Sequence, residues 1–150
     1  MFHRYRYEYR YYAKLERIPL SMRMKLDLTG VKLSLGDWLA FDLTERRVLC
    51  HLPYSDMEDR KTITDFLEVL AQRYLGRSVA RNQPMDEFLW DSASIPPEVL
   101  CQCPAGKAIT SEEWNRWPSH RRYALFKTAT SKNEPDAFAQ LLDEFRERPD

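Results

Sequence analysis

Cysteine, histidine and long apolar runs are all scarce in this sequence, and each scarcity excludes a class of protein. The chain of 150 residues contains three histidines and three cysteines, namely Cys50, Cys101 and Cys103. An odd number of cysteines disfavours a disulfide framework and suits a reducing compartment. No stretch approaches the roughly 20 apolar residues of a transmembrane helix, and the first residues do not form the apolar segment of a secretory signal. We therefore predict a cytoplasmic protein that does not cross a membrane.

Neither sign of charge is in excess, because 23 Lys and Arg residues balance 23 Asp and Glu residues. This balance disfavours a basic footprint for DNA or RNA over the whole chain. Locally the charge is uneven: residues 1–25 hold seven Lys or Arg against two Glu, whereas residues 131–150 hold three cations against six acids. We predict that the two ends of the chain attract each other. With 43% hydrophobic residues, the chain is long enough for one soluble domain with a single core.

The sequence also lacks a recognisable catalytic or metal-binding constellation. The three histidines are scattered, without the HExxH spacing of a zinc protease. Cys101, Cys103 and His120 would give at most three zinc ligands, and no further cysteine pair lies at a suitable spacing. Paired acids such as Glu112 and Glu113 are typical of a helix start, where they interact favourably with the helix dipole. We predict no enzyme, no bound metal and no cofactor.

One pattern occurs twice in the chain, with an offset of 76 residues. The two stretches are LSLGDWLAFDLTERRVL (33–49) and ITSEEWNRWPSHRRYAL (109–125). Trp38 matches Trp114 and Arg46 matches Arg122, and an isoleucine–proline pair precedes each copy. Such self-similarity indicates an internal duplication. We predict a single domain with an arm at 1–16, repeat one at 17–76, a linker at 77–94 and repeat two at 95–150.

Each copy carries the signals of short helices. A Ser or Thr is followed three residues later by an acid, which is the arrangement of a capping box. The pairs are Ser34 with Asp37 and Thr110 with Glu113. A longer helix ends each copy, because apolar residues recur at intervals of three and four over residues 63–74 and 138–145. The predicted fold class is therefore all-α, with two pseudo-repeats of short helices in one compact domain.

Strand-like alternation occurs in one place, the stretch YRYEYRYY at residues 5–12. Tyrosine occupies every second position there, with Arg or Glu between. Aromatic rings interleaved with arginines suit single-stranded nucleic acid, because bases stack on rings and phosphates pair with cations. An arm whose alternate side chains pack on the helices explains both the alternation and the uneven charge with fewer assumptions. We predict an extended N-terminal arm of this packing kind.

The stretch RIPLSMRMKLDLTGVKLSLGDWLAFDLTERRVLCHLP at residues 17–53 has the pattern of a known family. It contains an isoleucine–proline pair, an R-x-K-L-D run, Gly30, Trp38 and a leucine–proline pair. Downstream, IPPEV (95–99) and WNRWPSHRRYALFK (114–127) are similar to the second half of the same pattern. On these residues the chain resembles the nitrate reductase-associated protein family, small bacterial proteins linked to assimilatory nitrate reductase.

The resemblance implies a non-catalytic accessory or maturation factor for a molybdenum-containing assimilatory nitrate reductase. Such a factor would bind the reductase or its maturation machinery through a cationic face, because electrostatic complementarity orients two partners and speeds their association. The predicted partner-binding residues are Arg23, Lys25, Lys32, Arg46, Arg122 and Lys127. A structural role stays open for Arg46 and Arg122, since each guanidinium can instead pair with an acid of its own repeat.

Two other functions stay open on the sequence alone. A nucleic-acid-binding regulator would use the tyrosine–arginine arm and the short helices, and its binding would weaken linearly with the logarithm of the salt concentration. A sensor for nitrate or for a molybdenum-cofactor precursor would need a concave, arginine-lined pocket. Binding of that ligand would raise the thermal stability of the protein.

Overall fold

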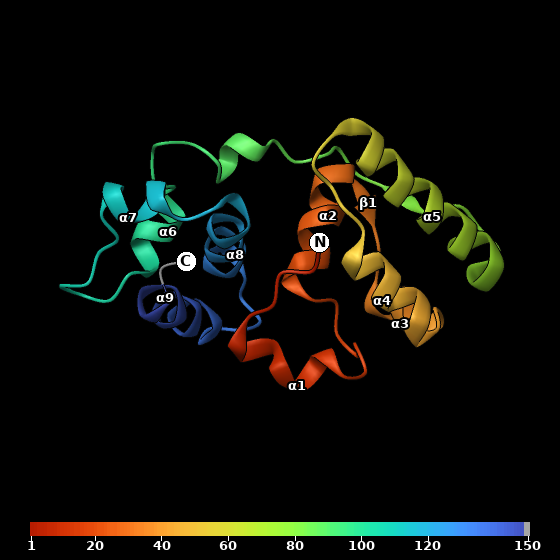
Figure 1. Ribbon diagram of the computed structural model, residues 1–150, viewed down its shortest axis with the longest axis horizontal. Coiled ribbons are helices and arrows are strands. Elements are labelled where there is room, and N and C mark those ends of the chain that lie inside the picture. The colour runs from red at the N-terminus through yellow and green to blue at the C-terminus, as the bar shows by residue number, and fades with distance from the viewer. Residues whose placement is uncertain (149–150) are drawn as a thin grey trace. The chain divides into compact units, whose positions relative to one another are not determined.

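Helices, most of them short, make up about 60% of the backbone in the computed structural model, which describes residues 1–148 (Figure 1). The first half contains the 3₁₀ helix η1 (Arg6–Glu8), α1 (Tyr9–Tyr12), α2 (Leu20–Thr29), α3 (Leu35–Ala40), α4 (Leu43–His51) and α5 (Met57–Leu75). The second half contains η2 (Glu87–Leu89), α6 (Pro97–Gln102), α7 (Ser111–Arg116), α8 (Ser119–Thr130) and α9 (Ala137–Glu147). The prediction of a mainly helical fold is confirmed.

The described backbone contains one small sheet, formed by the two-residue strands β1 (Val31–Lys32) and β2 (Ala80–Arg81). The strands are antiparallel, with Val31 opposite Arg81. Next to them, the Asn82 N–H donates to the Gly30 carbonyl at 2.6 Å. The sheet therefore fixes the chain after α5 against the C-terminal end of α2.

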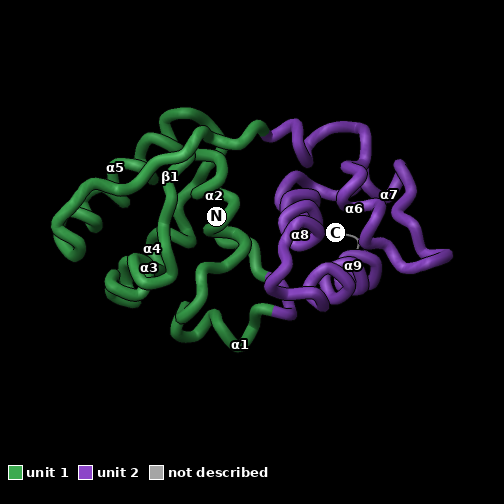
Figure 2. The backbone as a smooth tube through the Cα atoms, turned by 180° about the vertical axis from the view of Figure 1, so that it is seen from behind, with its two compact units in different colours: residues 1–4, 8–86 green, residues 5–7, 87–150 purple. Residues whose placement is uncertain are grey.

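The chain divides into two compact units (Figure 2). Unit 1 consists of Met1–Arg4 and Glu8–Asp86. Unit 2 consists of Tyr5–Tyr7 and the chain from Glu87 onward. The change from one unit to the other after Asp86 falls within the segment 77–94 that separates the two sequence copies.

Both predicted capping boxes are present. The Ser34 hydroxyl accepts from the Asp37 N–H at 3.0 Å while the Asp37 carboxylate accepts from the Ser34 N–H. Thr110 and Glu113 make the same reciprocal pair at the start of α7. Two orphan N–H groups are thus satisfied at each helix start.

Matching elements begin at matching sequence positions. Helices α3 and α7 begin 76 residues apart, and so do α4 and α8. The indole N–H of Trp38 donates to the Leu15 carbonyl at 2.7 Å, and that of Trp114 donates to the Ser92 carbonyl at 2.9 Å. Each tryptophan therefore holds the segment that precedes its copy. The origin of these similarities in an internal duplication stays a prediction.

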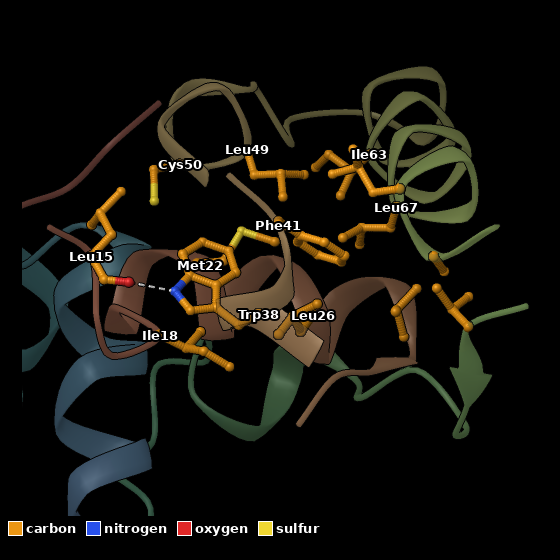
Figure 3. Close-up of a cluster of buried hydrophobic side chains, with 14 residues drawn as sticks. Leu15, Ile18, Met22, Leu26, Trp38, Phe41, Leu49, Cys50, Ile63 and Leu67 are labelled. Carbon is orange, nitrogen blue, oxygen red and sulfur yellow. Dashed lines mark hydrogen bonds between the residues drawn. The ribbon is translucent and has the colours of Figure 1, made fainter. Parts of the chain in front are cut away.

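The core of unit 1 lies between α2, α3, α4 and α5 (Figure 3). Trp38 of α3 is completely buried there, and its indole N–H points to the Leu15 carbonyl. The other buried side chains of the cluster are Leu15, Ile18, Met22, Leu26, Val31, Phe41, Leu49, Cys50, Ile63, Leu67, Leu70, Ala71 and Val79. Burial of apolar area of this kind is the main stabilising contribution to such a small unit.

Aromatic side chains dominate the core of unit 2. Trp90 is completely buried and packs edge-on against Tyr123, with ring centroids 4.9 Å apart. Trp117 packs edge-on against Phe145 of α9 at 5.9 Å. Tyr5, which belongs to this unit, also lies against the Phe145 ring, at 5.9 Å. Edge-to-face pairs of this kind add to the stability that their buried area gives.

The prediction of an extended N-terminal arm is wrong for residues 6–12, which form η1 and α1. Glu8 explains the difference, because its buried carboxylate accepts from the Tyr12 hydroxyl at 2.8 Å and from the Leu20 N–H at 3.0 Å. The first contact joins residues four apart, a separation that a helix brings together. The second satisfies an orphan N–H at the start of α2, where Pro19 offers no side-chain cap.

The predicted attraction between the chain ends is confirmed at Arg6. Its backbone N–H donates to the Glu144 carboxylate at 2.7 Å, and its guanidinium lies 2.8 Å from the Glu147 carboxylate. Glu144 is buried, so its contact with Arg6 is the better shielded of the two. All three residues belong to unit 2.

Replacing Gly30 with alanine is expected to destabilise unit 1 more than replacing Gly76. Both glycines end helices in the left-handed region, with φ of +77° and +65°. Such a conformation costs an L-residue about 1–2 kcal/mol. A Cβ on Gly30 would also lie 2.4 Å from the Asn82 carbonyl oxygen, whereas nothing lies within 4 Å of one on Gly76.

Urea denaturation of both variants measures this difference. We expect Gly30→Ala to lose at least about 1 kcal/mol more than Gly76→Ala, because the strand backbone must move to relieve the collision. Equal losses would show that the contact between Gly30 and Asn82 is not tight in solution.

Candidate partner-binding surface

The backbone at Leu15 has a conformation that the surrounding side chains stabilise. Among residues 1–148, Leu15 is the one residue other than glycine with a positive φ, at 47°. Its side chain is completely buried, and its carbonyl accepts from Trp38 at 2.7 Å and from the Arg46 guanidinium at 3.0 Å. A left-handed leucine costs of order 1–3 kcal/mol and persists where packing over-determines it. Helices α3 and α4 therefore fix the direction of the chain at this turn.

Two further arginines bind carbonyl groups on either side of Leu15. Arg47 of α4 donates to the Ala13 carbonyl at 3.0 Å, and Arg23 of α2 donates to the Ile18 carbonyl at 3.1 Å. Both side chains are on exposed residues. The segment 13–18 is thus surrounded by guanidinium groups from two helices.

Exposed cations gather around this segment, and we call Arg10, Lys14, Arg17 and Arg47 the basic cluster. All four residues are exposed. The guanidinium groups of Arg10 and Arg17 lie 5.3 and 4.6 Å from the centroid of the Tyr11 ring, so both arginines stack on one side chain. Glu16 is the one carboxylate in residues 9–18. The surface here is locally basic although the chain as a whole is neutral.

Lys25, one of the six predicted partner-binding residues, is not on the surface. Its side chain is completely buried, and its ammonium donates to the Leu49 carbonyl at 2.9 Å and to the Cys50 carbonyl at 2.6 Å. These carbonyls lie in the last turn of α4, where a cation is favoured by the helix dipole. Burial lowers the pKa of Lys25 from 10.5 to about 8. The structure therefore corrects its expected place on a cationic face, because the ammonium joins α4 to α2 inside unit 1.

The other predicted residues divide between the two units. Arg23, Lys32 and Arg46 belong to unit 1, and Arg122 and Lys127 belong to unit 2. Arg23 and Arg46 both bind the segment 13–18, whereas Lys32 is exposed on β1. A partner-binding role for these residues stays a prediction.

Each of the three guanidinium nitrogens of Arg122 donates a hydrogen bond within unit 2. Its guanidinium donates to the Asp91 carboxylate at 3.0 Å, to the Trp117 carbonyl at 2.9 Å and to the Asn115 carbonyl at 3.0 Å. Arg122 therefore pairs with an acid, but Asp91 belongs to the segment 77–94 predicted as the linker and not to repeat two, where the acid was expected. Lys127 lies half-buried in the last turn of α8.

The basic cluster was missed as a site, although the sequence contains its signal. Three of its members lie among the seven cations counted in residues 1–25. The sequence could not show that Arg47 belongs to this cluster. Arg47 comes close to residues 13–18 through its hydrogen bond to the Ala13 carbonyl, and Ala13 lies 34 residues away in the sequence.

Burial in unit 1 disfavours the charged forms of His3 and Cys50. The His3 ring lies 3.1 Å from the Tyr54 hydroxyl, and burial lowers the pKa of His3 to about 4. Burial also raises the pKa of the Cys50 thiol to about 12. Cys101 is exposed and Cys103 is half-buried in unit 2. Within residues 1–148, no group of three or more His, Cys, Asp or Glu side chains is placed to hold a metal ion.

One family model matches nearly the whole chain. A model described as conserved nitrate reductase-associated protein matches residues 4–145. The chain belongs to this family. The matched range covers parts of both units and includes the whole basic cluster. Searches of the curated proteins and of the solved structures give no match. None of the helices in residues 1–148 has the length and apolar character needed to span a membrane.

Proposed function

We propose that the protein is a non-catalytic accessory or maturation factor that acts in the cytoplasm of a nitrate-assimilating bacterium. It binds nitrate reductase, or the machinery that matures the enzyme, through the exposed side chains of the basic cluster. The family description supports the link to the reductase. The observation that carries the binding mode is the concentration of four exposed cations around residues 9–18.

Electrostatics explains what such a cluster contributes. A basic patch attracts an acidic patch on a partner, which raises the association rate and selects one orientation. Each exposed ion pair adds only about 0.2–1 kcal/mol, so several pairs must act together. The rigid attachment of residues 13–18 to α2 and α4 keeps these cations in place, which reduces the entropy lost on binding.

The alternating tyrosines favour protein binding over nucleic-acid binding. Tyr5 is 3% exposed and its hydroxyl donates to the His120 carbonyl. Tyr12 donates to Glu8, and Tyr11 already stacks with two arginines. Tyr9 is 58% exposed. Stacking of successive bases, however, would require the rings of the neighbouring tyrosines to be exposed as well.

Reversing the charge of the basic cluster is expected to abolish capture of the reductase. The variant Arg10→Glu, Lys14→Glu, Arg17→Glu turns three exposed cations into anions without touching a buried side chain. The tagged protein is purified from its own host grown on nitrate, and the proteins that accompany it are quantified by mass spectrometry. We expect wild type to recover nitrate reductase or its maturation proteins, and the variant to recover at least about tenfold less.

A matched control separates local from general charge effects. Arg81→Glu, Lys107→Glu, Lys132→Glu changes three exposed cations away from the basic cluster and alters the net charge by the same amount. It is expected to capture the reductase like wild type. Equal recovery by all three proteins would refute binding through the basic cluster. Recovery of neither the reductase nor its maturation proteins by any of them would refute the proposed function.

A further inference from the structure

The Tyr11 ring brings together two arginines of the basic cluster. The guanidinium groups of Arg10 and Arg17 lie 5.3 and 4.6 Å from the centroid of this ring. Both distances are within the roughly 6 Å over which a cation is attracted to an aromatic ring. Arg10 is the neighbour of Tyr11 in the sequence, whereas Arg17 comes after the left-handed turn at Leu15. The turn therefore returns the chain so that one ring contacts both arginines.

The backbone that carries the Tyr11 ring is joined to the core of unit 1. The Tyr11 carbonyl accepts from the Leu15 N–H at 2.7 Å. The Leu15 carbonyl accepts in turn from Trp38 and from Arg46, and the side chains of Leu15 and Trp38 are completely buried. The half-buried Tyr11 ring thus has a fixed attachment, although the two arginines that it contacts are exposed.

The fold itself makes little use of the Tyr11 side chain. Within residues 1–148, its hydroxyl has no hydrogen-bond partner and its ring forms no aromatic pair. By contrast, the Tyr5 and Tyr12 hydroxyls each donate a hydrogen bond, and the Tyr9 ring lies 6.0 Å from the Tyr12 ring. The polar and ring contacts of Tyr11 side-chain atoms are therefore those with the two arginines of the basic cluster.

An arginine that is already ordered binds a partner more tightly than a mobile one. A free arginine side chain has many rotamers, and most of that freedom is lost when it is fixed in an interface. Stacking on an aromatic ring removes part of the freedom before the partner arrives. A stacked guanidinium can still donate hydrogen bonds from its edge to a carboxylate.

We propose that Tyr11 is a positioning residue of the basic cluster, whose ring holds the Arg10 and Arg17 side chains in the conformation that binds acids of the partner. The inference rests on the proposed function and adds the residue that prepares the cluster for binding. Tyr11 itself does not contact the partner. It raises the affinity by ordering two cations, not by supplying a charge or a further contact.

Nuclear magnetic resonance relaxation tests the ordering in the free protein. Nitrogen-15 relaxation at the arginine Nε atoms reports motion on the picosecond to nanosecond timescale. Arg81, which is exposed on β2, is the reference. We expect higher order parameters for Arg10 and Arg17 than for Arg81 in wild type and in Tyr11→Phe, and a fall to the level of Arg81 in Tyr11→Leu. Equal mobility of all three arginines in wild type would overturn the proposal, whatever the partner.

Affinity for purified nitrate reductase from the same host, or for its maturation proteins, tests the consequence for binding. We expect Tyr11→Leu to bind about fivefold more weakly or worse, because two arginines must then be ordered on binding. The salt dependence of binding should not change, since no charge is removed. Tyr11→Phe keeps the ring and is expected to restore wild-type binding. Thermal denaturation checks that each variant is folded.

A double-mutant cycle shows whether Tyr11 acts through the two arginines. At low salt concentration, Tyr11→Leu is introduced into the variant Arg10→Gln, Arg17→Gln, which retains Lys14 and Arg47. We expect its effect on binding to fall below about twofold there, because the groups that it orders are gone. A fivefold loss that persists in this background would show that Tyr11 contacts the partner directly, and would overturn the proposal.

The outcomes separate this inference from the proposed function. If wild type and folded Tyr11→Leu bind the partner equally well, the positioning role is refuted and the proposed function stands. If wild type binds neither the reductase nor its maturation proteins, the proposed function fails, and the role of Tyr11 in binding fails with it. Loss of arginine order and of affinity in Tyr11→Leu, with both restored in Tyr11→Phe, supports both claims.

Discussion

Replacing Trp38 with alanine is expected to remove roughly 3–5 kcal/mol of stability, the range found for large aromatic residues in closed cores. Trp38 is completely buried between the helices of unit 1, so its removal leaves a cavity in the core. It also removes the 2.7 Å hydrogen bond to Leu15, whose strained backbone would then be held by Arg46 alone. Because a small domain is stable by only about 5–15 kcal/mol, this loss is a large fraction of the stability of unit 1.

Urea denaturation followed by far-UV circular dichroism measures the loss, with Trp38→Phe as the control. Phenylalanine retains most of the buried area and loses the indole N–H, so we expect a cost of roughly 1–2 kcal/mol. Trp114→Ala should cause a comparable loss in unit 2, since Trp114 is equally buried and holds Ser92 in the same way. The remaining three tryptophans all lie in unit 2, so the fluorescence of Trp38→Ala reports whether that unit stays folded. Wild-type stability of Trp38→Ala would contradict the described core.

Lys25 is expected to make unit 1 more stable as the pH rises from 8 to 10.5. Its pKa is about 8 in the folded protein because burial disfavours the charged form, against 10.5 for an ordinary lysine. Between these values the unfolded chain binds more protons than the folded chain, so the free energy of unfolding increases with pH. Below pH 8 both states are protonated and the contribution is constant. The shift corresponds to a rise of about 3 kcal/mol across the window.

Comparison with Lys25→Met isolates this effect within the window from pH 8 to 10.5, because the other groups whose pKa values Lys25 lowers do not titrate inside that window in the folded protein. The Met1 ammonium, His3 and His51 titrate at or below its lower end, and the Cys50 thiol titrates above its upper end. The substitution removes the burial cost of the ammonium but leaves two carbonyls of α4 without their donor, which costs roughly 1–3 kcal/mol each. The two proteins should therefore be closest in stability near pH 7, and wild type should gain the advantage above pH 8. Lys32→Met, at an exposed lysine on β1, should show no such trend. A parallel pH dependence of wild type and Lys25→Met would show that Lys25 is solvated.

Local sequence signals predicted the starts of α3 and α7 correctly. Contacts between residues far apart in the sequence explain why the structure of residues 6–12 was predicted wrongly. A capping box needs only residues three apart, so Ser34 with Asp37 could be identified directly. The helical form of residues 6–12 depends in part on Glu8 capping a helix that begins 12 residues later, and no local pattern contains that contact. Alternating tyrosines therefore looked like a strand.

The burial of Lys25 could not be deduced because α2 is not a surface helix with one apolar face. Its residues on nearly all sides are buried, including Met22, Met24 and Leu26. Arg23 occupies the exposed side of α2, whereas Lys25 lies inside, where the α4 carbonyls that it meets decide its position. The excess of positive charge near the N-terminus could be predicted from the sequence. The complete basic cluster could not, because the fold brings Arg47 next to Ala13.

The central claim is that the basic cluster binds an acidic surface of nitrate reductase or its maturation machinery. Sedimentation velocity of the purified chain with purified nitrate reductase from the same host tests it most directly, in buffers from about 0.05 to 0.3 M salt, where the Debye length falls from about 14 to about 6 Å. We predict a complex that forms at low salt, weakens at least about tenfold over this range, and is lost in the Arg10→Glu, Lys14→Glu, Arg17→Glu variant. A complex indifferent to salt and to this variant, or no complex at any salt concentration with the reductase or its maturation proteins, would contradict the account.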